Sequence, residues 1–172
     1  MTTRRSFLKF GVGGALALAA GGALYRGLQH GAPDRFNLDA AGRELLTAVV
    51  PALLGPALPS APAARQQAIQ ANVERVKVAI AGLPLAAQGE LQDLFGLLAL
   101  APTRRLLAGL PAWRDATPTQ LEEFLQGWRL HRFAQLRAGY QALHDLVIGS
   151  WYADPSSWAA IGYPGPMPEL AA

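Results

Sequence analysis

The side chains that most often carry catalysis or bind metals are few and scattered in this chain. Histidine occurs three times, at His30, His131 and His144, and none of the 172 residues is cysteine. On one helix, His131 and His144 would stand about 20 Å apart, because each residue adds about 1.5 Å. They cannot share a metal ion there, and the chain offers no thiolate for zinc, iron–sulfur clusters or covalent haem.

The carboxylates do not suggest a catalytic arrangement either. Glu122 and Glu123 are neighbours, so on a helix they point about 100° apart, which suits a solvated face better than an acid–base pair. His144 and Asp145 form a polar pair without a serine nucleophile suggested nearby, and no glycine-rich dinucleotide turn follows a strand. We therefore predict no catalytic, cofactor-binding or metal-binding residue, and a protein that is not an enzyme.

The most specific motif lies at the N-terminus, in the sequence TTRRSFLKF. Its residues match a twin-arginine (Tat) export signal, S/T-R-R-x-F-L-K, at Thr3, Arg4, Arg5, Phe7, Leu8 and Lys9. The uncharged apolar run over residues 11–25 supports the same interpretation. Signals of this type carry folded proteins, often with a cofactor already inserted. The motif predicts export to the periplasm by the twin-arginine translocase and raises the question of where the cofactor lies.

The fate of this leader, residues 1–30, stays open between cleavage and retention. Ala-Leu-Ala at 15–17 or 17–19 fits a small-x-small cleavage site but lies inside the apolar run. Residues 7–25 are close to the roughly 20 residues that span a bilayer as a helix. A retained leader would anchor the chain to the inner membrane, with its arginines on the cytoplasmic side.

The net charge of +3 belongs to the leader and not to the rest of the chain. From residue 31 onward, 11 basic residues stand against 12 acidic ones. Nucleic-acid binding needs a surplus of basic side chains, so we predict no nucleic-acid partner. With 16% charged residues, the chain is also apolar for a soluble protein, where about 25% is typical. This composition indicates a surface that something else covers.

Proline and apolar periodicity divide residues 31–154 into helices, without strand-like alternation or an internal repeat. We predict an all-α fold, a small bundle of about four to five helices. Helices are expected at about 39–54 with Asp39 as the N-cap, at 62–82, at 85–100 and, as a short piece, at 102–109. Pro51 is expected to kink or end the first of them.

The fifth predicted helix begins with a capping box at 117–120 and then meets no proline until Pro155. One apolar stripe comprises Leu121, Leu125, Trp128, Leu136, Gly139, Leu143 and Leu146. A second stripe comprises Phe133, Tyr140, Val147 and Trp151. Two stripes indicate packing on two sides, either inside the bundle or between the bundle and a partner. Arg132 falls on the apolar face, where it either pairs with Glu90 or Asp93 or reaches a partner.

The last segment, residues 155–172, is a tail rich in aromatic side chains, glycine and proline. Asp154-Pro155 is expected to initiate a turn, with Ser156 as the cap of a short helical turn, and residues 162–166 to be rigid and extended. Aromatic side chains offer large contact area at little entropic cost. The tail therefore either contacts a partner or folds back onto its own helices. The predicted partner-binding residues are Tyr140, Trp151, Tyr152, Trp158, Gly162, Tyr163, Pro164, Gly165 and Pro166.

The leader, the helical body and the tail together resemble the gluconate 2-dehydrogenase subunit 3 family, small subunits of membrane-bound flavin-dependent dehydrogenases. The matching residues are the leader motif, Val49-Val50-Pro51, and Gly162, Tyr163, Gly165 and Pro166 after an aromatic–Asp-Pro turn. The resemblance implies a large catalytic partner of the glucose–methanol–choline type that lacks its own signal. It also implies a membrane cytochrome c subunit that accepts the electrons. FAD would lie in the partner, haem in the third subunit, and no cofactor in this chain.

Two hypotheses about function follow. The first is a non-catalytic small subunit that supplies the export signal and assists folding and export of the dehydrogenase. The second is a stand-alone, membrane-anchored periplasmic scaffold or binding protein. A ligand-sized pocket lined by the fifth helix and the tail would favour the second.

Overall fold

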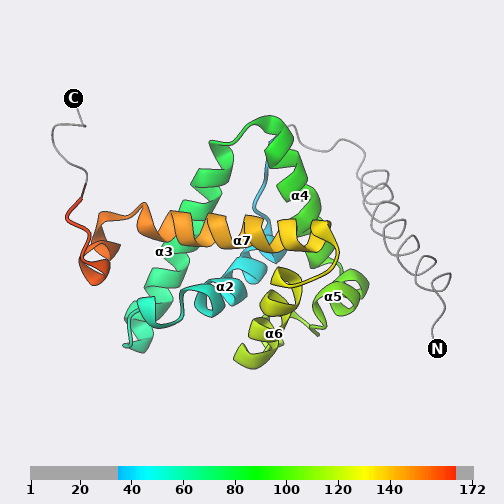
Figure 1. Ribbon diagram of the computed structural model, residues 1–172, viewed down its shortest axis with the longest axis horizontal. Coiled ribbons are helices and arrows are strands. Elements are labelled where there is room, and N and C mark those ends of the chain that lie inside the picture. Colours follow the sequence, from blue (N-terminus) through cyan, green and yellow to red (C-terminus); the bar gives the residue numbers. More distant parts are fainter. Residues whose placement is uncertain (1–34, 166–172) are drawn as a thin grey trace.

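The computed structural model describes residues 35–165, and every regular element in that range is helical (Figure 1). The α-helices are α2 (Ala40–Leu54), α3 (Pro62–Ala81), α4 (Leu85–Ala99), α5 (Ala101–Ala108), α6 (Pro118–Arg129) and α7 (Ala134–Tyr152). Four short 3-10 turns join or follow them: η1 (Gly55–Ala57), η2 (Trp113–Asp115), η3 (Pro155–Ser157) and η4 (Ala159–Ile161). The predicted all-α class is confirmed. The leader lies outside the described residues.

Helix α2 lies at the centre of the bundle and packs against α3, α4, α6 and α7. Figure 1 shows α7 crossing in front of α3, with α5 and α6 gathered near its beginning. The fully buried residues of α2 meet those of α3 and α7 in one core. They are Leu45, Leu46, Val49 and Val50 on α2, Val73, Val76 and Ile80 on α3, and Leu143 and Val147 on α7.

The first helix begins where the sequence predicts and continues past its proline. The Asp39 carboxylate accepts a hydrogen bond of 2.8 Å from the Gly42 N–H, which satisfies one of the free donors of the first turn. Pro51 lies inside α2 and does not end it, because the chain continues helically to the buried Leu54. The helix ends at Gly55, whose φ of +48° suits glycine.

The predicted fifth helix is wrong as one continuous element. Residues 130–133 form a loop, so that α6 ends at Arg129 and α7 starts at Ala134. Arg137 Nη1 holds the loop by donating to the carbonyl oxygens of His131 and Arg132, at 2.7 and 3.1 Å. Because of this break, α6 folds back and packs against α7. In one straight helix the two segments would lie end to end, and their apolar faces could not contact each other. The described bundle therefore has six α-helices instead of the predicted four to five.

The packing of α6 on α7 depends on a glycine, which gives a testable expectation. A Cβ atom added to Gly139 would stand 2.6 Å from a ring carbon of Trp128. We expect Gly139→Ala to lower the free energy of unfolding by about 1–3 kcal/mol through overpacking, despite the better helix propensity of alanine. Urea denaturation measures the change.

The matched control is Gly149→Ala on the same helix, because a Cβ there meets nothing within 4 Å. We expect this control to be neutral or stabilising by up to about 1 kcal/mol. Equal unfolding free energies for the two variants would contradict the close contact between Gly139 and Trp128.

Candidate partner-binding surfaces

The tail follows the predicted order of a turn, a short helical segment and an extended end, and differs from the prediction in its cap. After α7 it forms η3 and η4 and becomes extended only beyond Gly162. The cap of the first turn is Asp154 and not Ser156, because the Asp154 carboxylate accepts a hydrogen bond from the Ser156 N–H at 2.9 Å. Figure 1 shows these turns beyond the end of α7, on the side away from α5 and α6.

Trp158 organises the tail into a compact knob. Its indole N–H donates to the Tyr152 carbonyl oxygen at 2.8 Å, and its ring meets Tyr163 edge-on with centroids 5.2 Å apart. Gly162 takes a φ of +68°, and a Cβ on Gly165 would stand 3.2 Å from the Trp158 ring. The tail knob, Tyr152 and residues 158–165, therefore folds on itself and on the end of α7.

The predicted partner-binding residues do not form one site. The structure brings Tyr152, Trp158, Gly162, Tyr163 and Gly165 together in the tail knob, and Trp151 is half-buried on α7 just before it. Tyr140 lies twelve residues before Tyr152 on α7, with its ring beside His144 at 5.6 Å between centroids. Pro164 is exposed next to Gly165, and Pro166 lies outside the described residues.

An ion pair fastens the start of the tail to the bundle. Arg75 on α3 pairs with the Asp154 carboxylate, whose other oxygen accepts from Ser156. The hydrogen bond from the Ser156 backbone, its side chain and the Arg75 charge hold the pKa of Asp154 below its ordinary value. Because the folded pKa is lowered, the stabilisation is fully present above the ordinary Asp pKa of 3.8 and is lost as the pH falls through the folded pKa.

We expect Asp154→Asn to loosen the tail at neutral pH by about 1 kcal/mol or less, the range for a partly exposed ion pair. Hydrogen exchange at the Trp158 indole N–H measures it, since that proton is bonded only while the tail knob is folded. The difference from the unmodified chain should begin to shrink as the pH falls below 3.8 and vanish only below the lowered pKa of Asp154 in the folded chain. Asp145→Asn is the control, because Asp145 does not touch the tail; an equal effect there would contradict the anchoring role.

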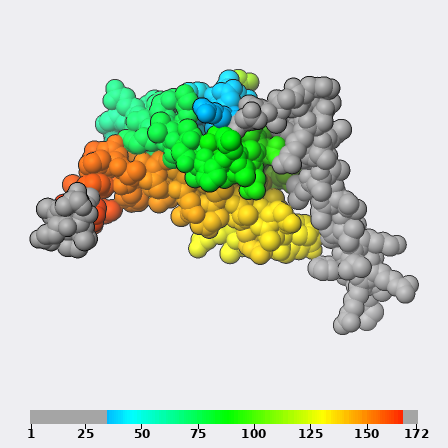
Figure 2. All heavy atoms as spheres, turned by 90° about the horizontal axis from the view of Figure 1, so that it is seen from above, coloured from blue at the N-terminus to red at the C-terminus, as the bar shows by residue number. Residues whose placement is uncertain are grey.

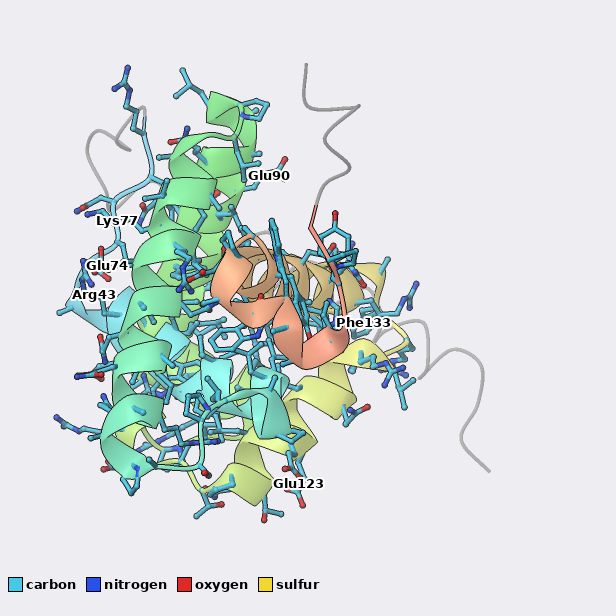
Figure 3. All side chains as sticks on the ribbon, turned by 90° about the vertical axis from the view of Figure 1, so that its left-hand side faces the viewer. Arg43, Glu74, Lys77, Glu90, Glu123 and Phe133 are labelled. Atoms are coloured by element: carbon cyan, nitrogen blue, oxygen red, sulfur yellow. The ribbon has the colours of Figure 1, made fainter. Side chains whose placement is uncertain are left out.

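A broad apolar groove lies between α5, α6 and the start of α7, and we call it the α5–α6 groove. Its volume is about 690 Å³, and its lining includes Leu107, Phe124, Trp128, Phe133 and Leu136. Leu106 on its rim is 80% exposed, and Leu130 in the neighbouring loop is 79% exposed. Phe133 and Glu123, both labelled in Figure 3, belong to the lining of this groove. The sequence prediction missed this surface, because it depends on how α5 and α6 are spaced.

Arg132 lies at the edge of that region and differs from its prediction. It belongs to the loop between α6 and α7 and not to an apolar helix face. Its guanidinium lies over the Phe133 ring, 4.8 Å from the centroid. Together with Arg129 and Arg137, it makes the loop strongly basic beside the exposed apolar rim.

A second groove runs between α4 and α7, and we call it the α4–α7 groove. Two adjoining hollows of about 550 and 460 Å³ share Glu90, Leu94, Gln135 and Ala138. Figure 2 shows α7 at the surface beside the α3–α4 pair, and Figure 3 places Glu90 on the α7 side of α4. The charged residues that line these two hollows are all acidic: Glu90, Asp93 and Asp145.

Two groups give this groove its polar character. Asp145 accepts hydrogen bonds from His144 and from Gln141 at 2.9 and 2.7 Å, and these bonds lower its pKa, so it stays ionised. The Ser150 hydroxyl, on a residue only 5% exposed, lines one end of the groove and has no hydrogen-bond partner in the described part of the chain.

Within residues 35–165, no group of three or more His, Asp or Glu side chains is placed to hold a metal ion. The prediction that His131 and His144 lie on one helix is wrong, because His131 lies in the loop and His144 on α7. Over the same residues, no single helix is both long and apolar enough to cross a membrane; α2 with η1 and α3 meet that criterion only as a pair bent by 118°.

Comparison with known proteins adds no relative to this picture. No protein-family model matches the chain, and no curated protein or solved structure is significantly similar to it.

Proposed function

We propose that this chain is the non-catalytic small subunit of an exported, flavin-dependent dehydrogenase complex. It carries the twin-arginine signal and assists the folding and export of a large catalytic subunit of the glucose–methanol–choline type. In this proposal, FAD belongs to the large subunit and haem to a membrane cytochrome c subunit. The complex works in the periplasm at the inner membrane, whether or not the leader is cleaved.

The observation that carries the proposal is the exposed apolar surface around the α5–α6 groove. Leu106 and Leu130 are among the most exposed large apolar side chains in the described range. Burying one such side chain contributes about 1.5–3 kcal/mol, and clustered exposed apolar residues mark protein interfaces. The neighbouring Arg129, Arg132 and Arg137 supply a polar rim, as protein interfaces commonly have.

The tail knob offers a second contact surface at the far end of α7. Tyr163 is 45% exposed, and Ile161 beside it is exposed as well. The edge-on contact with Trp158 fixes the Tyr163 ring before any partner binds, so little side-chain entropy is lost on association. This geometry supports the predicted use of the tail in partner binding.

The experiment is co-purification of the large subunit with variants of this chain. We expect Leu106→Ser combined with Leu130→Ser to weaken the complex about tenfold or more, equivalent to about 1.4 kcal/mol, because both apolar contacts are lost. Leu85→Ser is the control, since Leu85 is also exposed but lies on α4, outside the α5–α6 groove. Full retention of the large subunit by the double variant would show that this surface is not the interface.

A second candidate is a membrane-anchored periplasmic binding protein. The α5–α6 groove favours it by its volume of about 690 Å³, which falls in the range of small-molecule sites, but the tail does not line this groove as that hypothesis expects. In that case a small ligand, and no large subunit, would accompany the purified chain.

A further inference from the structure

We propose that the α4–α7 groove is the docking site for an α-helix of a partner protein, a helix with a stripe of apolar residues and basic side chains on both flanks. This inference goes beyond the proposed function, because it concerns the chemistry of the occupant and is tested with a synthetic helix. The walls of the groove select that helix by shape and by charge.

The floor of the groove is apolar and open to a second helix. Leu94 on α4 and Leu146 on α7 line it, and both are only half-buried. Ala138, Ala142 and Gly149 share one face of α7, which also lines the groove. Because the distance between packed helices depends on the side chains at the contact, these small residues let a second helix come close to α7.

The two rims of the groove are acidic. Glu90 on α4 and Asp145 on α7 are both exposed and line it from opposite walls, with Figure 2 showing α4, in green, beside α7, in orange. Glu90 makes no ion pair within residues 35–165. Among the described residues, no lysine, arginine or histidine lines either hollow of the groove. An apolar floor between acidic rims is complementary to an amphipathic helix with basic flanks.

The size of the groove corresponds to about four turns of helix. The lining residues on α7 run from Gln135 to Ser150, which is about 22 Å at 1.5 Å per residue. A partner helix of about 15 residues would therefore fill the groove from end to end.

The buried Ser150 hydroxyl indicates the direction of the docked helix. Ser150 is only 5% exposed, lines one end of the groove, and its hydroxyl has no hydrogen-bond partner among the described residues. The last turn of a helix has unpaired carbonyl groups, which can accept a hydrogen bond from such a hydroxyl. The C-terminal end of the docked helix would therefore lie at Ser150.

The acidic side chains at the other end favour the same direction. Asp93 lies beside Gln135 there, and Glu90 is one turn before it on α4. A helix N-terminus carries a partial positive charge, which carboxylates stabilise. Both ends of the groove thus favour a helix that runs parallel to α7.

A second copy of this chain is a poorer occupant. A symmetric contact through the groove would set Glu90 and Asp145 against the acidic rims of the copy, and like charges across an interface oppose association. The acidic rims therefore favour a different protein with a basic helix.

The probe for the test is a fluorescent synthetic peptide of about four helical turns, with alanine and leucine on one face and lysine on both flanks. Its counterpart carries glutamate in place of every lysine. Fluorescence anisotropy measures the binding of each peptide to the full-length chain. We expect the lysine peptide to bind at least about tenfold more tightly than the glutamate peptide, and its binding to weaken as salt is added.

Variants of the chain distinguish the groove from the rest of the surface. Ala138→Trp places a large side chain in the groove at an exposed position and should weaken binding of the lysine peptide about tenfold or more. Glu90→Arg with Asp145→Arg should have a similar effect through like-charge repulsion. The matched controls, Ala63→Trp on α3 and Glu44→Arg on α2, are exposed outside the groove and should leave binding unchanged. Circular dichroism checks that each variant is folded, and the two groove variants act by different means.

Disulfide formation tests the direction, because the chain contains no cysteine of its own. The exposed Ala138 and Gly149 stand about 16 Å apart along α7. We expect Ala138→Cys to react at least about fivefold faster with a lysine peptide that carries an N-terminal cysteine than with one that carries a C-terminal cysteine. Gly149→Cys should show the opposite preference, because docking raises the effective concentration of the nearer thiol.

Three results would overturn the proposal. The first is equal binding of the lysine and glutamate peptides, and the second is binding that both groove variants leave unchanged. The third is self-association of the chain that Ala138→Trp abolishes, since this would identify a second copy as the occupant. A reversed disulfide preference would overturn the assigned direction. These measurements use no large subunit, so their failure is distinct from failure of the proposed function.

Discussion

Replacing Arg4 and Arg5 by lysine is expected to stop export of this chain and, with it, of the large catalytic subunit. Lysine keeps the positive charge but loses the planar guanidinium with its five donors, so the two residues are not interchangeable in a recognised motif. The expected result is accumulation of both subunits in the cytoplasm and background dehydrogenase activity in the periplasm. Immunoblots of the two fractions and a dye-linked activity assay measure it.

The control is Arg26→Lys, which changes a leader arginine outside the twin-arginine motif. Export should be normal in this variant. A large subunit that still reaches the periplasm when Arg4 and Arg5 are both lysine would contradict the role of this chain as the carrier of the export signal.

The largest effect on folding is expected for Trp128→Ala, which should lower the free energy of unfolding by about 3–5 kcal/mol. Trp128 is 3% exposed, and its ring meets Phe124 with centroids 4.9 Å apart. Its indole N–H donates to the Leu107 carbonyl oxygen at 2.7 Å, which ties α6 to α5. The same ring packs on Gly139 of α7, so the substitution removes a contact among three helices.

Two further variants separate the causes. Trp128→Phe keeps most of the ring and removes the donor to the Leu107 carbonyl, so it should cost only about 1–3 kcal/mol. Trp158→Ala should open the tail knob with little effect on global unfolding, because Trp158 contacts the tail and the end of α7. Urea denaturation gives all three values. A Trp128→Ala variant within 1 kcal/mol of the unmodified chain would contradict the central position of this residue.

The elements that could be predicted are those whose ends are marked in the sequence. Pro62 opens α3, Gly109 follows α5 in a left-handed conformation, and Asp39 and Thr117 cap α2 and α6. Proline, glycine and short polar side chains act locally, through fixed φ angles or hydrogen bonds to the first turn. Their effect is therefore readable without the rest of the fold.

The break between α6 and α7 has no such mark. No proline or glycine occurs in residues 130–133, and the loop is held by Arg137, which lies in the next helix. The turn, the short helical segment and the extended end of the tail could be predicted, but the hydrogen bond from the Trp158 indole to the Tyr152 carbonyl oxygen, which holds the tail on the end of α7, could not. In both cases a contact between residues several positions apart decides the conformation.

The candidate surfaces could be predicted only in part. The aromatic residues between 151 and 163 are recognisable in the sequence as a cluster of large side chains. In the structure they form the tail knob and its attachment to α7. The α5–α6 and α4–α7 grooves are not visible in this way, because each depends on the distance between helices that are separate in sequence. The sequence around Ser150 does not predict that the hydroxyl of this residue is buried without a hydrogen-bond partner among the described residues.

The central claim is that this chain is the small subunit of a flavin enzyme, and one purification tests it most directly. The chain is extended with a C-terminal affinity tag, isolated from native membranes and examined by absorption spectroscopy and mass spectrometry. The claim predicts a flavin spectrum and a much larger co-purifying subunit. A colourless preparation that contains this chain alone would contradict it.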